Sequence, residues 1–164
     1  ESLKKVIFAG ILCTIMVMIF MIIYYRLLGF FASLALVIYI ALTLGIFKLV
    51  PITMSLAGLA GFILTIGMAV DANILIFERM KEEVKRGLSR STALEEGFRR
   101  AWPSIRDSNT STIITAIILY YLTSSFVRGF ALTLLIGVTV SLFSAITTTR
   151  LFLRVFLKDR KANF

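Results

Sequence analysis

The sequence predicts an all-α membrane protein, a bundle of five transmembrane helices joined by one long basic loop. Hydrophobic residues make up 59% of the 164 residues, mean hydropathy is +0.93, and the apolar residues gather in long runs. Most of the connections between these runs are only long enough for tight turns. The basic residues fall almost entirely between and beyond the runs, a placement typical of membrane proteins. The same placement argues against nucleic acid as a partner.

Each apolar run is close to the roughly 20 residues that a helix needs to cross a bilayer. The fourth run is the shortest, and Ser and Thr residues are frequent where it begins. Their hydroxyl groups can bond to carbonyls of their own helix, so we count this run as a span. The five predicted spans are residues 6–25, 30–47, 52–77, 108–122 and 129–151.

The long connection, residues 78–106, is predicted to form a helical loop. We expect the third helix to continue through Lys85 and to break at Gly87. A second helix is expected over residues 91–100, with Ser91 as its N-cap. The charges of both signs that precede Gly87 are expected to form a solvated helix face with pairs four residues apart.

Trp102 and Pro103 are expected to open the fourth span. Proline suits the first turn of a helix, where its missing N–H would have no helical partner. Tryptophan suits the headgroup region of a membrane.

The basic residues predict the orientation of the chain. Of the 18 Lys and Arg residues, only Lys4, Lys5, Lys48 and Arg128 fall on the side that holds the N-terminus. The other fourteen fall on the side of the first turn, the long loop and the C-terminus. By the positive-inside rule, that side is cytoplasmic and the N-terminus is outside the cytoplasmic (inner) membrane. We therefore expect a further span and an external domain upstream of Glu1.

The residue types present argue against an enzyme. The sequence has no histidine, one cysteine and no Gly-rich phosphate loop followed by Lys-Ser or Lys-Thr. The commonest metal ligand and general base are therefore absent. We expect no catalytic residue, no metal site and no cofactor.

Asp71 is the residue that stands out, because it alone among the nine acidic residues falls inside a predicted span. A charge in lipid costs at least about 2.5 kcal/mol, so we expect Asp71 to be buried in the bundle. A carboxyl group in this position is typical of a proton relay. The alternative is a structural hydrogen bond to a neighbouring helix.

Polar residues around the third and fourth spans are expected to support Asp71. At the start of the fourth span, Asp107 is equally well explained as an acid at the positive end of a helix dipole. The residues that we assign to a supporting polar path are Asn73, Asp107, Asn109, Thr110 and Thr112.

Small residues recur every four positions in two of the spans, a pattern that lets helix backbones approach closely. We expect these stripes to pack together and to hold Asp71 away from lipid. They are Ala57, Gly61 and Thr65 in the third span, and Thr133, Gly137, Ser141, Ala145 and Thr149 in the fifth.

Three stretches resemble the SecD family of protein-export membrane proteins. Residues 67–83 read Gly-Met-Ala-Val-Asp-Ala-Asn-Ile-Leu-Ile-Phe-Glu-Arg-Met-Lys-Glu-Glu, and residues 107–112 and 128–134 match two further SecD stretches. The resemblance covers residues 51–154. The sister subunit SecF would be expected to show an Asn-Asp-Thr type of run and a Phe-Asp-Arg instead.

The resemblance implies half of a transmembrane domain of the resistance-nodulation-division superfamily. It implies pairing with SecF, work beside the SecY channel complex on exported unfolded polypeptide, and contact with membrane lipids. Asp71 would match the proton-relay aspartate, and Asp107 with residues 109–112 the polar face of the next helix. The driving force would be a proton gradient, or a sodium gradient. An assisting membrane arginine would come from SecF.

Two other functions remain open from the sequence. One is half of a lipid or drug exporter of the same superfamily, which would carry a comparable proton site. The other is a scaffold whose polar residues only bond helices together. Dependence on protons separates the scaffold from the other two, and a defect in protein export separates SecD from an exporter.

Overall fold

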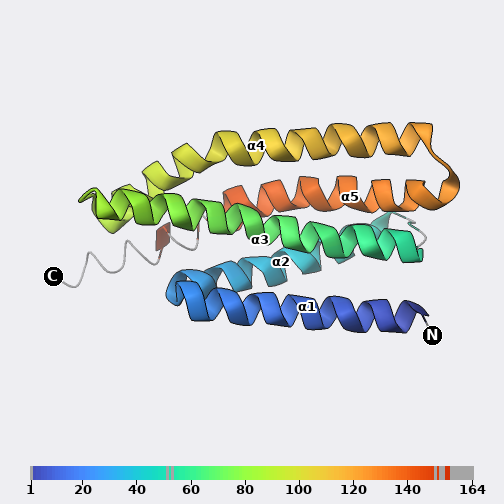
Figure 1. Cartoon of the computed structure of the whole chain (residues 1–164), viewed down its shortest axis with the longest axis horizontal. Helices are drawn as coiled ribbons and strands as arrows, with labels where there is room; N and C mark the ends of the chain where they lie inside the picture. The colour runs from blue at the N-terminus through green and yellow to red at the C-terminus, as the bar shows by residue number, and fades with distance from the viewer. Residues whose placement is uncertain (1, 51, 53, 150, 152–153, 156–164) are drawn as a thin grey trace.

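Five long α-helices lie roughly along one common axis in the computed structural model of the chain (Figure 1). The structure describes residues 2–50, 52, 54–149, 151 and 154–155. All the regular structure in this part of the chain is helical, which confirms the predicted fold class. The elements are α1 (Ser2–Tyr25), α2 (Leu27–Leu49), α3 (Leu56–Lys85), α4 (Arg90–Leu122), α5 (Ser125–Phe143) and a short π-helical segment (Ser144–Thr149).

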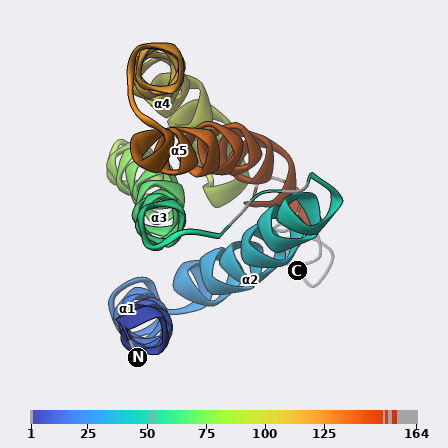
Figure 2. The same cartoon turned by 90° about the vertical axis from the view of Figure 1, so that its right-hand side faces the viewer.

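The central helix is α3, which packs along both α4 and α5. Viewed along the axis, these three helices form one cluster, and α2 leads from it to α1 at the periphery (Figure 2). Helix α1 packs mainly on α2, so most of its apolar side chains are exposed. Exposed apolar residues over a whole helix require lipid or another protein around them.

Four helical segments of the described chain are long and apolar enough to cross a membrane: α1, α2, α3 and α5 with the turn that follows it. Helix α4 is not among them. Its first half carries the charged residues of the long loop, and the predicted fourth span begins with hydroxyl residues; both lower its mean hydropathy. The fourth span at residues 108–122 therefore stays a prediction.

The α1–α2 turn is tighter than predicted, with Arg26 as the only residue between the two helices. Arg26 takes a left-handed conformation with φ of 51°. Gly29 then lies against the backbone of Met21 so closely that a Cβ atom would overlap it. Because glycine has no Cβ, the two helices can fold back on each other within one residue.

The prediction for the long loop is right about the end of α3 and wrong about the helix that follows. As predicted, α3 ends at Lys85 and Gly87 breaks the helix, with φ of 93°. The separate second helix and the new start at Pro103 are wrong, because α4 runs unbroken from Arg90 to Leu122. Its N-cap is Ser89, not Ser91: the Ser89 hydroxyl accepts a hydrogen bond from the backbone N–H of Thr92.

Pro103 is tolerated inside α4 for a local reason. Proline lacks the N–H that would bond to the carbonyl four residues earlier, here that of Arg99. Arg99 lies on an exposed side of the helix. Water or lipid headgroups can therefore satisfy the freed carbonyl, so the helix continues.

The two stripes of small residues pack against each other, as predicted, in the α3–α5 contact. A Cβ atom on Gly61 would lie 2.9 Å from the carbonyl oxygen of Phe130, and one on Gly137 would lie 2.7 Å from the Cβ of Thr65. Both distances are too short for a larger residue, so the glycines set the closeness of the helices. The side chain of Thr149 lies outside the described residues.

Candidate functional site

Asp71 borders a groove of about 200 Å³ between α3 and α4. Ser108 and Asn109 of α4 line the same groove, so three polar residues lie along it. Apolar side chains complete the walls: Met68, Ala72 and Leu75 of α3 and Ile105 of α4. The structure thus brings Asp71 and part of the predicted polar path together.

The side chain of Asp71 is exposed in this chain, which corrects the expectation that it is buried within the bundle. The neighbouring positions Val70 and Ala72 are buried, whereas the side chain of Asp71 lies on the outward side of α3. A carboxyl group at membrane depth has to face protein or water, because lipid does not solvate it. Asp71 therefore marks a face of the bundle that protein or water, and not lipid, has to contact.

Asn109 is a polar residue of α4 that lines the same groove as Asp71. It is buried, and its amide Nδ2 donates a hydrogen bond to the carbonyl of Ile105 at 2.7 Å. Its Oδ1 is also buried and has no hydrogen-bond partner within the described part of the chain. A buried acceptor without a donor costs about 1–3 kcal/mol, so this atom favours any donor that enters the groove.

The hydroxyl groups of the fourth predicted span are used within their own helix. Thr110 donates to the carbonyl of Arg106 at 2.7 Å, and Thr112 donates to that of Ser108 at 3.1 Å. Ser108, Ser111 and Thr115 make bonds of the same kind. This satisfies their donors and explains how so many polar residues are accommodated. Thr110 and Thr112 do not line the groove of Asp71.

Asp107 is also separate from the groove. It is exposed and forms an ion pair with Arg106, with Nε and Oδ1 2.9 Å apart. Because α4 begins at Arg90, Asp107 lies in the helix interior and not at a helix start. The interpretation of Asp107 as an acid at the positive end of a dipole is therefore wrong.

Asn73 lies on another side of α3. It is buried beside Met21 of α1 and Ser33 of α2. Two residues along an α-helix correspond to a rotation of about 200°, so Asp71 and Asn73 point in nearly opposite directions. The structure consequently places Asn73 among the α1–α2–α3 contacts, away from the groove.

Sequence reasoning missed a polar contact in the centre of the bundle. The Tyr39 hydroxyl of α2 donates to Thr65 Oγ1 of α3 at 2.8 Å, and both residues are fully buried. Thr65 in turn donates to the carbonyl of Phe62 at 2.7 Å. Only the position of tyrosine within an apolar run could have signalled this contact.

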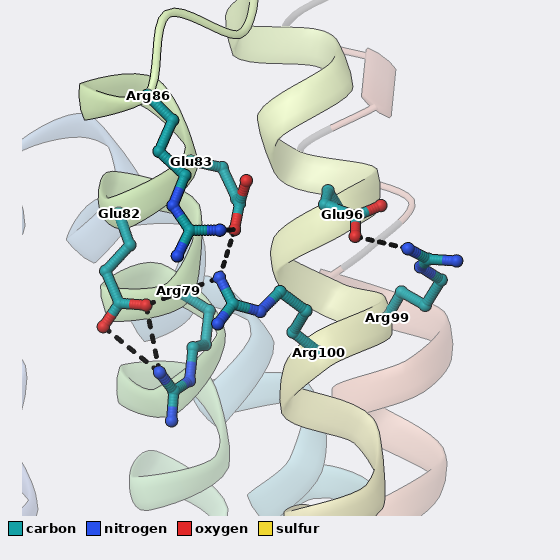
Figure 3. Close-up of polar contacts among 7 residues, drawn as sticks. All are labelled: Arg79, Glu82, Glu83, Arg86, Glu96, Arg99 and Arg100. Atoms are coloured by element: carbon teal, nitrogen blue, oxygen red, sulfur yellow. Dashed lines mark hydrogen bonds and ion pairs between the residues drawn. The ribbon is translucent and has the colours of Figure 1, made fainter.

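A second contact that the sequence did not indicate joins α3 and α4 at the Gly87 turn (Figure 3). Glu83 is buried, and its carboxylate pairs with Arg100 of α4 and, at 3.2 Å, with Arg86. Arg100 also lies 3.7 Å from Glu82. The expectation of a fully solvated charged face is wrong for Glu83.

Other pairs near this turn lie three residues apart, not four as predicted. Arg79 pairs with Glu82, and Arg99 pairs with Glu96. Gly97 of α4 packs on the backbone of Met80, where a Cβ atom would lie 2.6 Å from the amide nitrogen. The close approach of the two helices is what buries Glu83.

These features define a class of protein: a polytopic helical membrane protein with a carboxyl group on a face left open by its own helices. Residues 1–159 match the family described as protein export membrane protein SecD/SecF, C-terminal. The chain belongs to this family.

Known relatives are similar along nearly the whole chain. The protein translocase subunit SecD of Thermobaculum terrenum is 53% identical over 161 residues, and that of Synechocystis is 50% identical over 157; each alignment covers 96% of this chain. A crystal structure of SecDF, a translocon-associated membrane protein from Thermus thermophilus, matches with a TM-score of 0.91 and 38% identity over 96% of this chain. These similarities confirm the resemblance to the C-terminal region of SecD.

The chain spans about a third of the curated relatives it matches, 31% and 33% of their lengths, and 22% of the SecDF chain.

Proposed function

We propose that this chain is the transmembrane part of a SecD protein that assists Sec-dependent protein export together with SecF, driven by the proton-motive force. The similarity to translocase subunits named SecD supports the export role. The structures named SecDF support a SecF partner. Asp71, on an open face of the bundle, is the observation that carries the proton coupling.

The open face has the properties of a surface that SecF would cover. Beyond the groove, α3 presents Leu64 to the outside, seven residues before Asp71 and so on the same side of the helix. An apolar helix face beside an uncovered carboxyl is poorly suited to lipid, because lipid does not solvate Asp71. A second helical half docked here would enclose Asp71 and could supply a cation to it.

Asn109 gives the groove a way to respond to protonation. A protonated Asp71 carries an O–H donor, and the buried Asn109 Oδ1 is an acceptor in the same groove. When Asp71 loses its proton, that donor is lost and Asn109 requires another partner. Protonation would thus favour one α3–α4 arrangement over another, which is the two-state behaviour that a proton-driven motor needs.

Sodium is the second candidate for the driving ion. Asp71, Asn109 and Ser108 line the groove and each has a side-chain oxygen atom, and hard cations prefer oxygen ligands. No catalytic step is assigned to these residues. The proposal needs an ion gradient and no cofactor.

We also propose an orientation in the cytoplasmic membrane. The α1–α2 and α3–α4 turns lie at the same end of the bundle, and the basic residues of that end outnumber those of the other (Figure 1). By the positive-inside rule this end is cytoplasmic and Ser2 lies near the outer side. The test is to introduce a single cysteine at residue 87 and to label it from each side of the membrane. We expect it to react from the cytoplasmic side, and a reaction only from outside would reverse the proposed orientation.

The experiment that tests the function is an export assay in cells whose full-length protein carries Asp71→Asn. We expect export to fall to the level of a strain without the protein, while assembly with SecF is retained. Asp107→Asn is the matched control, because it removes a carboxylate from the same chain outside the groove. It should leave export within about twofold of the unmodified protein.

The outcomes separate the competing functions. Export unchanged by Asp71→Asn would overturn the relay and leave a scaffold. Loss of a lipid or drug efflux activity with normal protein export would favour an exporter half. Collapsing the proton and sodium gradients separately then identifies the driving ion.

A further inference from the structure

A cavity of about 560 Å³ lies at the Gly87 end of the bundle, between the α1–α2 turn and the last turns of α3. Its walls come from three parts of the chain that are far apart in sequence: residues 25–31, residues 80–85, and Arg90 at the start of α4. The cavity is separate from the Asp71 groove and shares no residue with it.

The charged residues that line the cavity are all cations: Arg26, Lys81, Lys85 and Arg90. Lys81 is partly neutralised by Glu78 at 3.1 Å, and its Nζ lies 4.3 Å from the centre of the Tyr25 ring. Since no acid lines the cavity, its lining residues carry a net positive charge.

The other described cations near the Gly87 turn are paired. Within the described part of the chain, the five cations of α3, α4 and the Gly87 turn that lie outside the cavity each have a carboxylate partner: Arg79, Arg86, Arg99, Arg100 and Arg106. Among the same described residues, Arg26, Lys85 and Arg90 form no ion pair. Among the described residues of α3, α4 and the two turns at this end, the cations without an ion pair are therefore the ones that line the cavity.

Apolar side chains form the rest of the walls. Leu28 and Phe31 of α2 and Met80 and Val84 of α3 line the same space as the cations. Leu27 and Val84 are also exposed on the outside of the bundle. A ligand that fits must therefore combine a negative head with an apolar body, and it must be able to enter from the level of the helix ends.

We propose that this cavity binds an anionic phospholipid of the surrounding membrane, with its headgroup phosphate between Arg26, Lys85 and Arg90 and its acyl chains along Leu28 and Phe31. Basic pockets between membrane helices at the headgroup level suit such lipids. The proposal is independent of the proton relay. The membrane is the favoured source of the phosphate because half of the lining is apolar, which a free phosphate ion would not use.

The test is native mass spectrometry of the purified full-length protein in detergent, titrated with phosphatidylglycerol or with phosphatidylcholine of the same acyl chains. The cavity variant is Arg26→Gln, Lys85→Gln and Arg90→Gln together. The matched control is Arg79→Gln, Arg99→Gln and Arg106→Gln together, which removes the same charge from paired positions of α3 and α4. A second cavity variant, Lys85→Gln with Arg90→Gln, spares the strained Arg26 turn.

We expect the unmodified protein to prefer phosphatidylglycerol by at least tenfold. Each charge removed from the cavity should weaken this binding by about fivefold, and the control should stay within twofold of the unmodified protein. Equal losses in cavity and control variants would overturn the site in favour of diffuse attraction. Equal binding of both lipids, or displacement by equimolar inorganic phosphate, would overturn the lipid assignment.

Discussion

Removal of Arg100 should destabilise the protein more than removal of its partner, Glu83. The carboxylate side chain of Glu83 is 4% exposed, whereas the side chain of Arg100 is 33% exposed. Breaking a fully buried ion pair by removing one partner costs about 3–5 kcal/mol, because a charge is left buried without compensation. Because Glu83 is more deeply buried than Arg100, leaving Glu83 without its partner should cost more stability than leaving Arg100 without its partner.

The magnitudes follow from what each change leaves behind. Arg100→Ala leaves Glu83 buried with Arg86 alone, at 3.2 Å. We expect the free energy of unfolding to fall by about 2–3 kcal/mol, below the full range because this second partner remains. Glu83→Gln leaves Arg100 free to turn to Glu82 or to water, so the loss should be about 1 kcal/mol.

The assay is reversible unfolding of the purified protein in mixed micelles, followed by circular dichroism as dodecyl sulfate is added. Arg99→Ala is the matched control, because Arg99 is 78% exposed in its pair with Glu96. Exposed pairs of this kind are worth about 0.5 kcal/mol or less. The Arg100→Ala and Glu83→Gln double variant should be more stable than Arg100→Ala alone, since no buried charge is left. The reasoning would be refuted if Arg100→Ala resembled Arg99→Ala, or if the double variant were the least stable.

Two other predictions use the same unfolding measurement. Gly137→Leu should lower the free energy of unfolding by about 1–3 kcal/mol, because the new side chain overlaps a threonine of α3. Gly67→Ala is its control: a Cβ there meets nothing within 4 Å, so the change should be neutral or stabilising. Ser89→Ala should cost about 1 kcal/mol by removing the N-cap of α4. Ser91→Ala should have almost no effect, and a larger loss at Ser91 than at Ser89 would show that α4 begins later than the structure has it.

Local sequence was sufficient for α1, α2, α3 and α5 and for the break at Gly87. The apolar runs that form α1, α2, α3 and α5 are long enough to span a membrane, and this depends on length and composition alone. The Gly61 and Gly137 stripes were equally readable, because four-residue spacing places small residues on one helix face.

Local sequence was insufficient for α4. Proline is a common helix start, and Pro103 follows a polar loop, so a new helix there was the natural expectation. Whether the helix can continue through Pro103 depends on whether the carbonyl of Arg99 finds a hydrogen-bond donor in place of the missing N–H. That depends on which side of α4 faces outward, and so on how α4 packs against α3.

For the candidate site, too, part was predictable from local sequence and part was decided by the tertiary structure. A carboxyl in an apolar run identified Asp71 from composition alone, because charge in lipid is costly wherever the chain folds. The tertiary structure decided that Asn109 shares its groove, that Asn73 faces the opposite side of α3, and that Asp71 is exposed. Helix rotation and packing set these neighbours, and both depend on residues distant in the sequence.

The sequence by itself determined a helical membrane bundle, its family resemblance and its one carboxyl at membrane depth, since each depends on the order and types of nearby residues. Only the tertiary structure decided which charges are paired. Glu83 and Arg100 are 17 residues apart and meet because Gly97 lets α4 approach α3. Arg26, Lys85 and Arg90 meet because two turns lie at the same end of the bundle. Contacts between distant residues are set by packing, which no local pattern of residues records.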